Sequence, residues 1–506
     1  MLPLEHFLEL ATHYSVIPLK NSLGSFEWFQ LDLFKLSQDY PYSLLLESGE
    51  HGKERGRFTY FADQPFLVIQ VEDNQVKIEA DPDELQQLKT NGLYEKIIDN
   101  PVSGIENISK RYRSPRILGY PPFTGGGIGY FSYEFIKRLE RIENANQKPS
   151  LFSEIHLAFV KELLVYDHAE KELQLFYNVM IETEDTEEQK KDKYLRAIEY
   201  LKQRAQFWQE RIEQCLQKPI PLHDLPEIRK NFEQPFLPDQ FMAAVETIKK
   251  NILKGEIFQA VLSQKLITKT KVHPAIVYQV LRQINPSPYM FYLQMNDETI
   301  VGASPETLVK VFNEEISTFP IAGTRPRGKT EQEDLALEQE LLADEKEQAE
   351  HVMLIDLARN DIGKVSKPGS VIVAEKMKIE RYSHVMHIVS KVIGQQKEEK
   401  SAFDVLKAVF PAGTVSGAPK VRAMELIAEL EPIERGPYAG AVAALAFNGN
   451  LDTCITIRSI FFKEETAYVQ AGAGIVADSV PLNEYMESMN KAKAMLKAIE
   501  ISESLS

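Results

Sequence analysis

The amino-acid sequence predicts a mixed α/β (α+β) fold in which strands are spread along much of the chain. Short runs rich in β-branched and aromatic residues have the length of strands; they cover residues 41–48, 66–73, 77–80, 156–167 and 172–182. A long charged helix is predicted over residues 184–217, and a second over residues 238–256, where Phe241, Val245 and Ile248 share one face and Gly255 ends the pattern. Strands and helices then alternate to the C-terminus.

A proline-containing polar stretch divides the chain. Residues 218–240 carry several prolines between polar residues and follow neither the helical nor the strand period, which is typical of a linker. We therefore predict an N-terminal region over residues 1–217 and a separate C-terminal domain over residues 241–506.

Composition excludes several classes of protein. Of the 506 residues, 43% are hydrophobic, and the longest apolar stretch, residues 439–447, is about half of what a membrane span needs. The N-terminus lacks the basic region and cleavage site of a secretory signal, and two cysteines, Cys215 and Cys454, form no disulfide framework. We expect a soluble cytoplasmic protein without a membrane partner.

The net charge of −16 argues against a nucleic-acid partner, which requires a basic surface. It also means that an anionic substrate must be bound by a local cationic pocket, because the overall field repels it.

Two pairs of glutamates recur at a spacing of one helical turn. Glu347 and Glu350 lie in a predicted helix over residues 344–361, and Glu484 and Glu487 repeat the spacing near the C-terminus. Side chains at i and i+3 share a helical face, where like charges repel. Each pair adjoins an apolar stripe, formed by Ala349, Val352, Met353 and Leu357 beside the first pair and by Met489, Ala492, Met495 and Leu496 beside the second. Partial burial would increase the repulsion.

A divalent cation would relieve this repulsion. Mg²⁺ prefers oxygen ligands and often binds one or two carboxylates together with water and an anionic substrate. We therefore predict a Mg²⁺ site shared between the two helices. The alternative is that the four glutamates form surface ion pairs with nearby lysines.

Three glycine-containing segments, residues 319–330, 410–420 and 470–479, place glycine beside small or hydroxylic residues. Such backbone allows N–H groups to approach an anion closely, although each segment alone also reads as a tight turn. Together with Arg458, whose guanidinium can bind a carboxylate bidentately, they indicate a carboxylate pocket. The fourth glycine-rich segment, residues 123–134, is not followed by a P-loop pattern, and we interpret it as a crowded strand.

Two histidines, His384 and His387, lie three residues apart in an apolar stretch. A histidine in such a stretch is more often a satisfied core group, but its pKa also makes it the usual proton abstractor near neutral pH. One of them is a candidate general base.

An ordered series of motifs resembles the chorismate-utilising enzymes, and most closely the anthranilate synthase component I group. The motifs include "GEIFQAVLSQK", "NPSPYMFYL", "GASPE", "PIAGTRPRG", "SHVMHIVS", "FPAGTVSGAPK", "CITIRS" and "QAGAGIVADSVP". The resemblance is dense over residues 241–499 and sparser before them, where it rests on "SLLLES", "GRFTYFA" and "GGGIGYFSYE".

The resemblance implies two antiparallel sheets packed as a core with helices outside, and chorismate, a dicarboxylate, as substrate. It places Mg²⁺ on Glu347, Glu350, Glu484 and Glu487. It implies a general acid at Glu306, a base at His387 and further active-site positions at Thr414 and Gln259. Its substrate-binding positions fall on Gly323, Thr324, Tyr438, Arg458, Gly472, Ala473 and Gly474. His384 then reverts to the structural interpretation.

Two positions favour one reaction within the resembled group. Relatives that add water carry a lysine where this chain has Gln259, and many aminodeoxychorismate synthases carry a nucleophilic lysine where it has Ala322. Neither residue can act in that way here, so ammonia addition giving anthranilate is favoured. Aminodeoxychorismate formation stays the alternative; a non-catalytic amino-acid sensor and a Mg²⁺-dependent phosphoryl-transfer enzyme are less favoured, the latter because no P-loop or kinase signature occurs.

The resemblance also implies a feedback site for tryptophan. Its positions are Leu46, Glu47, Ser48, Asn285, Pro286, Tyr289 and Met290. The same segments also read as an ordinary edge strand and an ordinary turn.

Neither cysteine lies in the Gly-x-Cys-x-Gly elbow of a glutaminase. We therefore expect a separate glutamine amidotransferase subunit that supplies ammonia.

Overall fold

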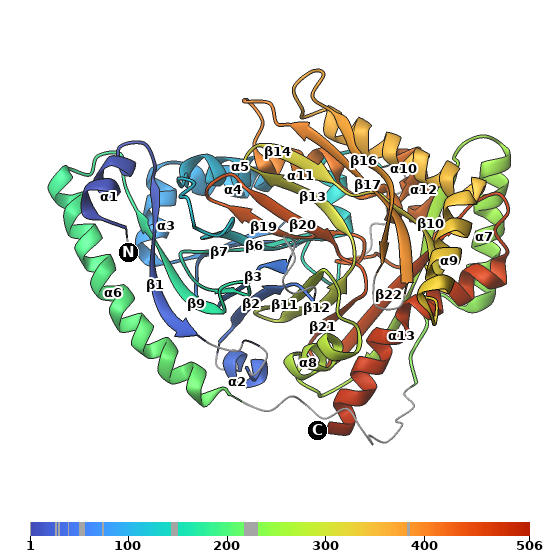
Figure 1. The fold of residues 1–506 in the computed structure, drawn as a ribbon, viewed down its shortest axis with the longest axis horizontal. Coiled ribbons are helices and arrows are strands. Elements are labelled where there is room, and N and C mark those ends of the chain that lie inside the picture. Colours follow the sequence, from blue (N-terminus) through green and yellow to red (C-terminus); the bar gives the residue numbers. More distant parts are fainter. Residues whose placement is uncertain are drawn as a thin grey trace.

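Two antiparallel β-sheets packed against each other form the centre of the computed structural model, and helices cover them from outside (Figure 1). The structure describes residues 2–25, 28, 31–38, 40–49, 56–72, 75–142, 150–216, 231–381 and 385–505. This arrangement confirms the predicted α+β class with two antiparallel sheets. Among the described residues, no helix is both long and apolar enough to cross a lipid bilayer.

The first sheet has eleven strands drawn from both ends of the chain. In spatial order they are β1 (Val16–Ser25), β9 (Glu172–Met180), β8 (Glu162–Asp167), β3 (Phe58–Ala62), β2 (Tyr42–Glu47), β11 (Tyr289–Met295), β12 (Glu298–Ser304), β21 (Ser459–Lys463), β22 (Thr466–Ile475), β10 (Gln259–Lys269) and β18 (Gly417–Ala418).

The second sheet also has eleven strands. In order they are β15 (Ile321–Pro326), β17 (Val385–Gln395), β14 (Glu315–Thr318), β13 (Thr307–Phe312), β20 (Leu451–Ile455), β19 (Ala441–Ala446), β6 (Gly126–Phe131), β7 (Ile155–Val160), β4 (Pro65–Glu72) and β5 (Gln75–Ala80), while β16 (Ile372–Arg381) pairs with β17. All five strand regions predicted from the sequence are confirmed, although residues 156–167 form two strands, β7 and β8.

Strands from the two sides of the predicted linker are neighbours in both sheets. In the first sheet β2 pairs with β11, and in the second β6 pairs with β19. Of the linker, residues 218–230 lie outside the described residues; Glu233 forms a bridge to Ile267, and Phe236 is buried. The division into residues 1–217 and 241–506 as separate domains stays a prediction.

The inner faces of the two sheets share one apolar core. Leu44 and Leu293 from the first sheet lie in the same buried cluster as Ile128 and Leu157 from the second. Removal of this surface from water is the main force that holds the sheets together.

The glycine-rich strand β6 is packed too tightly for larger residues. A Cβ atom on Gly126 would lie 2.0 Å from the carbonyl oxygen of Leu445, and one on Gly129 would lie 1.9 Å from that of His156. The interpretation of residues 123–134 as a crowded strand is therefore confirmed.

Helices surround the sheets. They are α1 (Leu4–Leu10), α2 (Leu33–Ser37), α3 (Pro82–Thr90), α4 (Leu93–Asp99), α5 (Pro101–Arg111), α6 (Glu187–Gln214), α7 (Pro238–Leu253), α8 (Pro274–Ile284), α9 (Glu331–Ala343), α10 (Glu345–Gly363), α11 (Ala402–Val409), α12 (Lys420–Leu430) and α13 (Pro481–Leu505), with 3₁₀ turns η3 (Tyr133–Arg138) and η4 (Gly413–Val415). The predicted helices over residues 184–217, 238–256 and 344–361 correspond to α6, α7 and α10, and Gly255 ends the second with a φ of 79°.

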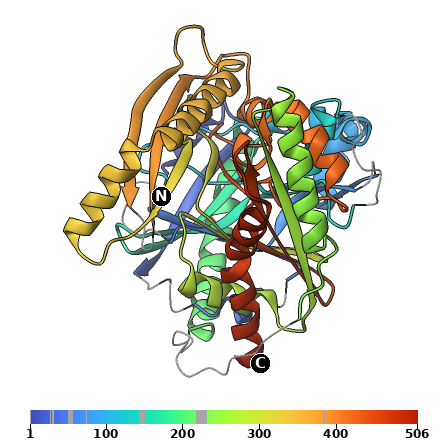
Figure 2. The same cartoon turned by 90° about the vertical axis from the view of Figure 1, so that its right-hand side faces the viewer.

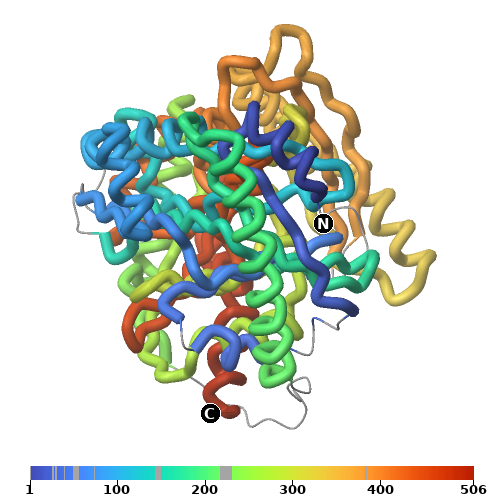
Figure 3. The backbone as a smooth tube through the Cα atoms, turned by 90° about the vertical axis from the view of Figure 1, so that its left-hand side faces the viewer, coloured from blue at the N-terminus to red at the C-terminus, as the bar shows by residue number. Residues whose placement is uncertain are grey.

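The long helix α6 runs beside α1 along one side of the molecule (Figure 3). On the opposite side, α7 and the C-terminal helix α13 lie side by side (Figure 2). Helix α10 packs against β15 and β17 of the second sheet. These positions place the glutamate pairs of α10 and α13 on the same side of the molecule as the end of β22.

A buried carboxylate network joins the two sheets. Glu298 of β12, fully buried, accepts a hydrogen bond of 2.9 Å from the Ser153 amide and lies 3.1 Å from Nδ1 of His156 in β7. Burial alone would raise the pKa of Glu298, but the contacts with His156, Tyr130 and Lys463 outweigh it and lower the pKa to about 2. Since the pKa of Glu298 is lower in the folded than in the unfolded chain, the ionised carboxylate stabilises the fold at any pH above the unfolded pKa. This contribution is lost as the pH falls towards 2.

We predict that Glu298→Gln lowers the free energy of unfolding by about 3–5 kcal/mol at neutral pH, because it leaves buried partners unpaired. Urea unfolding at pH 7 measures the loss, and a series down to pH 3 should show a shallower acid destabilisation in the variant. The exposed Glu315→Gln in β14 is a matched control that should change stability by less than about 1 kcal/mol. A Glu298 variant as stable as this control would contradict the role of the network.

Candidate active site

A half-buried carboxyl group and a hydroxyl meet where β12 turns into β13. Glu306 lies in this connection, and the hydroxyl of Thr414 in η4 donates a hydrogen bond of 2.7 Å to its Oε1. Burial raises the pKa of Glu306 to about 7, although the Thr414 hydrogen bond and the charge of Lys491 oppose the rise. A carboxyl group with such a pKa is partly protonated at neutral pH and can act as a general acid.

Glu306 and Thr414 line a cavity between α10, η4 and the second sheet. It has ≈ 460 Å³ of space between protein atoms, its open side included. Its other walls are largely apolar and include Leu354, Ala358 and Ile455. Low polarity of the walls explains why the charged form of Glu306 is disfavoured.

His387 in β17 is held in one orientation by β15. Its Nδ1 lies 2.9 Å from the carbonyl oxygen of Gly323 and 3.1 Å from the hydroxyl of Thr324. Because a carbonyl can only accept, Nδ1 carries the proton, and in the neutral ring Nε2 keeps its lone pair. Burial lowers the pKa of His387, and the charge of Arg458 lowers it further, against the bond to Gly323. The imidazole is therefore neutral at pH 7, as a base requires; His384 lies outside the described residues.

Gly323 allows the backbone of β15 to pass close to α10. Its φ is 63°, and a Cβ atom there would lie 3.2 Å from Oε2 of Glu347. The same position would meet Leu341 at 2.8 Å, so a larger residue does not fit. The glycine thus brings the strand that orients His387 next to the first glutamate pair.

Two glycines of β22 form another wall. A Cβ atom on Gly472 would lie 3.0 Å from the Tyr438 hydroxyl oxygen, and one on Gly474 would lie 2.6 Å from Nε2 of Gln259. Between them, Ala473 is fully buried and packs away against α7 and β10, so only its backbone remains available. The Gln259 amide reaches Oε1 of Glu350 at 3.5 Å, which connects this wall to α10.

Two cations complete the site. Arg458, with a φ of 52°, donates a hydrogen bond of 2.7 Å to the backbone carbonyl of Lys491. The Lys491 ammonium lies 3.1 Å from the carbonyl oxygen of Gly472 and 2.7 Å from Oε1 of Glu487. Burial lowers the pKa of Arg458, while Tyr438 and Glu487 oppose this, so the guanidinium stays charged. Arg458 and Lys491 are neighbouring cations of the kind that an anion site requires, while the local cationic pocket itself stays a prediction.

Lys491 was missed by the sequence reasoning. Its position four residues after Glu487 on one helix was a usable signal, because side chains at i and i+4 are neighbours.

The glutamate pairs repel as predicted. Burial raises the pKa of Glu347, and the charge of Glu350 raises it further. Burial and Glu487 likewise raise the pKa of Glu484, while the ammonium groups of Lys491 and of Lys346 in α10 lower it. Because the charge of Lys346 in α10 lowers the pKa of Glu484 in α13, the first turns of these two helices must approach each other.

The two apolar stripes had different outcomes. The stripe of α13 is confirmed, since Ala492 and Met495 are fully or almost fully buried. The stripe predicted for α10 is wrong: Val352 is 42% exposed, and the buried face carries His351, Leu354 and Ile355 instead. The reason is that α10 packs on the second sheet through His351, whose Nε2 lies 2.6 Å from the Ser390 hydroxyl.

The carboxylates have the chemistry of a Mg²⁺ site, but they are bound to other partners. Across the described ranges, no three or more acidic, histidine or cysteine side chains are close enough together to hold a metal ion. Glu347 lies 3.6 Å from Nη1 of Arg325, and Glu487 pairs with Lys491. All four are oxygen donors of the kind that Mg²⁺ prefers, so the set fits the ion in type. The Glu487–Lys491 pair is also what the ion-pair alternative predicts.

The predicted tryptophan positions gather where β2 meets β11. Glu47 lies opposite Met290, Leu46 follows opposite Phe291, and the Gly49 amide donates a hydrogen bond of 2.8 Å to Ser287. Asn285 and Pro286 directly follow the last residue of α8, just before this turn, and Ser48 is buried.

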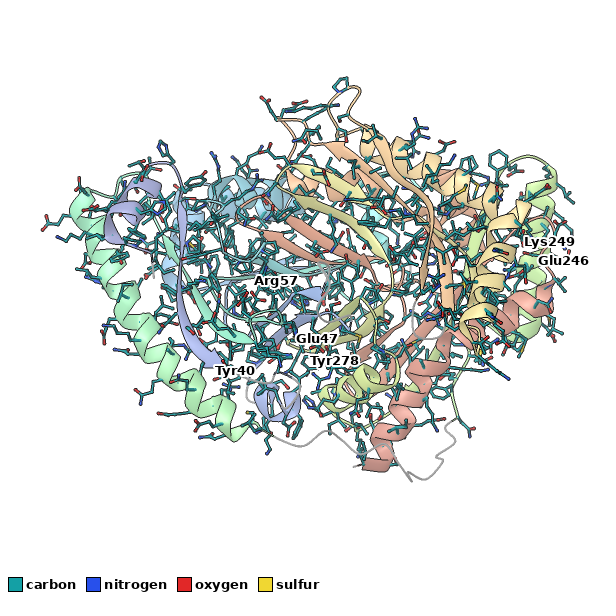
Figure 4. The ribbon with its side chains drawn as sticks, viewed as in Figure 1. Tyr40, Glu47, Arg57, Glu246, Lys249 and Tyr278 are labelled. Atoms are coloured by element: carbon teal, nitrogen blue, oxygen red, sulfur yellow. The ribbon has the colours of Figure 1, made fainter. Side chains whose placement is uncertain are left out.

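These side chains divide between the two faces of the first sheet. The hydroxyl of Tyr289 lies 2.9 Å from Oδ1 of Asp452, towards the second sheet. Glu47 accepts hydrogen bonds from Trp28 at 3.1 Å and from Tyr278 of α8, on the outer face (Figure 4).

A half-buried acid with a raised pKa, a neutral imidazole and two neighbouring cations are groups typical of an enzyme that acts on an anionic substrate. The comparisons with known proteins specify the family. The family of chorismate binding enzymes matches residues 42–497. The chain is 43% identical to anthranilate synthase component 1 of Acetivibrio thermocellus, over 97% of each chain, and 41% identical to that of Aquifex aeolicus, over 99% of this chain and 98% of the relative.

Solved structures agree. The crystal structure of anthranilate synthase component I from Streptococcus pneumoniae TIGR4 is 35% identical, with a TM-score of 0.69 over 87% of this chain and 92% of that chain. The menaquinone-specific isochorismate synthase of Escherichia coli, only 17% identical, has the same fold, with a TM-score of 0.65 over 98% of both chains. This chain belongs to the chorismate-binding enzymes.

We predict that Thr414→Val raises the pKa of Glu306 by about 1, because it removes a hydrogen bond that favours the carboxylate. The alkaline limb of the pH profile for chorismate turnover should move upward by the same amount, since the acid must be protonated. Thr318→Val is the control: Thr318 lines the same cavity but donates its hydrogen bond to Leu308. An unmoved limb in the Thr414 variant, or equal movement in both, would contradict the coupling.

Proposed function

We propose that the protein is the large component of an anthranilate synthase, which converts chorismate and ammonia to anthranilate and pyruvate in tryptophan biosynthesis. The observation that carries the proposal is the combination of a half-buried Glu306 carboxyl with a pKa of about 7 and a neutral, oriented His387. The 43% identity to a relative named anthranilate synthase component 1 supports it.

The proposed reaction needs one proton donor and one proton acceptor. Glu306 gives its proton to the C4 hydroxyl of chorismate, which leaves as water while ammonia forms a bond to C2. Nε2 of His387 then takes the C2 proton while the C3–O bond breaks and the ring becomes aromatic. The released enolpyruvate takes up a proton and becomes pyruvate, and the nitrogen bound at C2 returns a proton to Glu306. Because Nδ1 of His387 is bound to Gly323, the acceptor atom is fixed before the substrate arrives.

The two carboxylates of chorismate would be bound by the cationic and glycine-rich walls. We assign this role to Gly323, Thr324, Tyr438, Arg458, Gly472, Ala473 and Gly474, and add Lys491 because its ammonium lies at the Gly472 carbonyl. Arg458 can make two parallel hydrogen bonds to one carboxylate, whereas Lys491 acts as a point charge.

Mg²⁺ is the proposed cofactor. Glu347, Glu350, Glu484 and Glu487 would hold it, since they are the oxygen donors of the two neighbouring helices. When bound, the ion neutralises a carboxylate of the substrate. The raised pKa values of Glu347 and Glu484 indicate that these carboxylates are destabilised without a cation.

Two residues favour ammonia over other nucleophiles. Gln259 is 8% exposed and its amide reaches Glu350, so the position holds a neutral group that cannot activate water. Ala322 in β15 has no nucleophile that could attack chorismate. Aminodeoxychorismate synthesis for the folate pathway is the second candidate, because it also uses ammonia.

We propose that the protein acts in the cytoplasm and has two binding partners there. A separate glutamine amidotransferase subunit would release ammonia from glutamine, which accords with the "component 1" in the names of the relatives. Tryptophan would bind near Leu46, Glu47, Ser48, Asn285, Pro286, Tyr289 and Met290 and inhibit turnover.

The function is tested by incubating the purified chain with chorismate, ammonium chloride and Mg²⁺ and recording anthranilate fluorescence. We expect anthranilate without added lyase, its loss with EDTA, and a weaker Mg²⁺ response in Glu350→Gln. Aromatic product only after addition of aminodeoxychorismate lyase would favour the second candidate. Failure to consume chorismate would favour a non-catalytic sensor, and full activity in EDTA would exclude the Mg²⁺ site.

We predict that Ser48→Phe relieves tryptophan inhibition at least tenfold while turnover without tryptophan stays within about twofold. Ser48 is buried and precedes Gly49, which is packed on the Ser287 backbone, so a phenyl ring would occupy space beside the turn. The measurement is the tryptophan concentration for half inhibition. Ser48→Ala, which removes the hydroxyl without filling space, should remain inhibited by tryptophan. Equal inhibition of the Phe variant and the natural chain would show that tryptophan does not bind beside Ser48.

A further inference from the structure

A second pocket, away from Glu306, lies between η3 and α12. It has ≈ 440 Å³ of space between protein atoms, its open side included. Ile136, Met424 and Ile427 supply apolar walls, whereas Glu134 and Glu434 supply carboxylates. The proposed reaction uses none of these side chains.

The hydrogen-bond donors of this pocket already have partners. The ammonium of Lys137 lies 2.7 Å from Oε1 of Glu434, and that of Lys265 lies 2.7 Å from the Glu434 backbone carbonyl. The Arg435 guanidinium donates to the carbonyl oxygens of Val261 and Val415, each at 2.7 Å, and to Glu431. Its backbone amide donates to Oε1 of Glu134 at 2.9 Å.

Three acceptor atoms are left over. Oε2 of Glu134, Oε2 of Glu434 and the hydroxyl oxygen of Tyr133 are buried and have no hydrogen-bond partner within the described part of the chain. Glu134 is only 6% exposed, so its unpaired oxygen is costly. A small group with several donors and no acceptor matches the two carboxylate oxygens; the Tyr133 hydroxyl can accept from it and also carries a donor of its own.

The titrating groups around the pocket respond to such a ligand. Burial and the charge of Glu434 raise the pKa of Glu134 to about 7, and burial lowers the pKa of Lys265 to about 8. A bound cation favours the ionised form of Glu134. Binding should therefore strengthen from pH 6 to pH 8.

We propose that this pocket is a binding site for an ammonium ion. Ammonium is a small cation with four N–H donors and no acceptor, which matches the excess of acceptor atoms. Mg²⁺ fits poorly, because it demands near-octahedral oxygen ligands and retains water, whereas these walls are largely apolar. The choice of ammonium rests on the proposed function, in which ammonia is the nitrogen donor; the acceptor excess does not depend on it.

One side chain, that of Arg435, connects the pocket with residues next to the candidate active site. Arg435, which lines it, donates to Val415, the residue after Thr414, and lies 5.7 Å from the centre of the Tyr438 ring. The Arg435 side chain would thus lie between bound ammonium and both Tyr438 and the turn that carries Thr414.

The test is the melting temperature of the full chain in ammonium, potassium and sodium chloride at equal ionic strength, without chorismate. At ten times the dissociation constant, ammonium should raise it by about 1–2 °C more than sodium does. Glu134→Gln keeps the acceptor for the Arg435 amide but replaces the unpaired oxygen by a donor, and should abolish this difference. Tyr133→Phe, which removes only the hydroxyl, should reduce it.

The control is Glu140→Gln, which changes an exposed carboxylate just after η3 and should respond as the natural chain does. Equal effects of ammonium and sodium, equal effects of ammonium and potassium, or an unchanged ammonium effect in both pocket variants would each overturn the proposal. A third outcome would separate the two proposals: ammonium stabilises the natural chain but not Glu134→Gln, while the natural chain forms no anthranilate. This result would reject the proposed function and support the ammonium pocket.

Discussion

Pairing between distant strands is the constraint on which the rest of the molecule depends. β2 pairs with β11 in one sheet and β6 with β19 in the other, so neither sheet is complete without both ends of the chain. The second pairing is possible only because β6 is rich in glycine, since a side chain on Gly126 would collide with Leu445. The turn between β12 and β13, where Glu306 lies, therefore depends on contacts made by residues hundreds of positions away.

One physical cause prepares Glu306 and His387 for the proton transfers that we propose. Burial disfavours whichever form of a group carries charge, so it raises the pKa of the Glu306 carboxyl and lowers that of the His387 imidazole. Both groups are thereby shifted towards their neutral forms, in which one can donate a proton and the other can accept one. The nearby cations refine this state: Lys491 opposes the shift at Glu306, and Arg458 adds to the shift at His387.

Local patterns predicted the elements and the repulsion within each glutamate pair, because both depend on residues that are close in sequence. The class of two sheets came from the family resemblance, since strand order depends on pairings such as β2 with β11 that no local period records. The buried face of α10 was predicted wrongly for the same reason: the helix turns His351 towards Ser390, and a histidine does not count in an apolar stripe. Lys491 and Arg435 were missed because their roles arise from backbone carbonyls of other elements.

Arg435 shows how a fully buried ion pair can unite a site without lining it. Its guanidinium pairs with Glu431, which also accepts the amide of Ser263 at 2.7 Å, and it binds carbonyls in β10 and after Thr414. A buried pair of this kind gains little over an apolar substitute, but removal of one partner strands the other charge and frees two carbonyls. The strand that carries Gln259 and the turn that carries Thr414 therefore cannot move independently. Since Glu306 receives its hydrogen bond from that turn, its geometry is fixed by a cation that it never contacts.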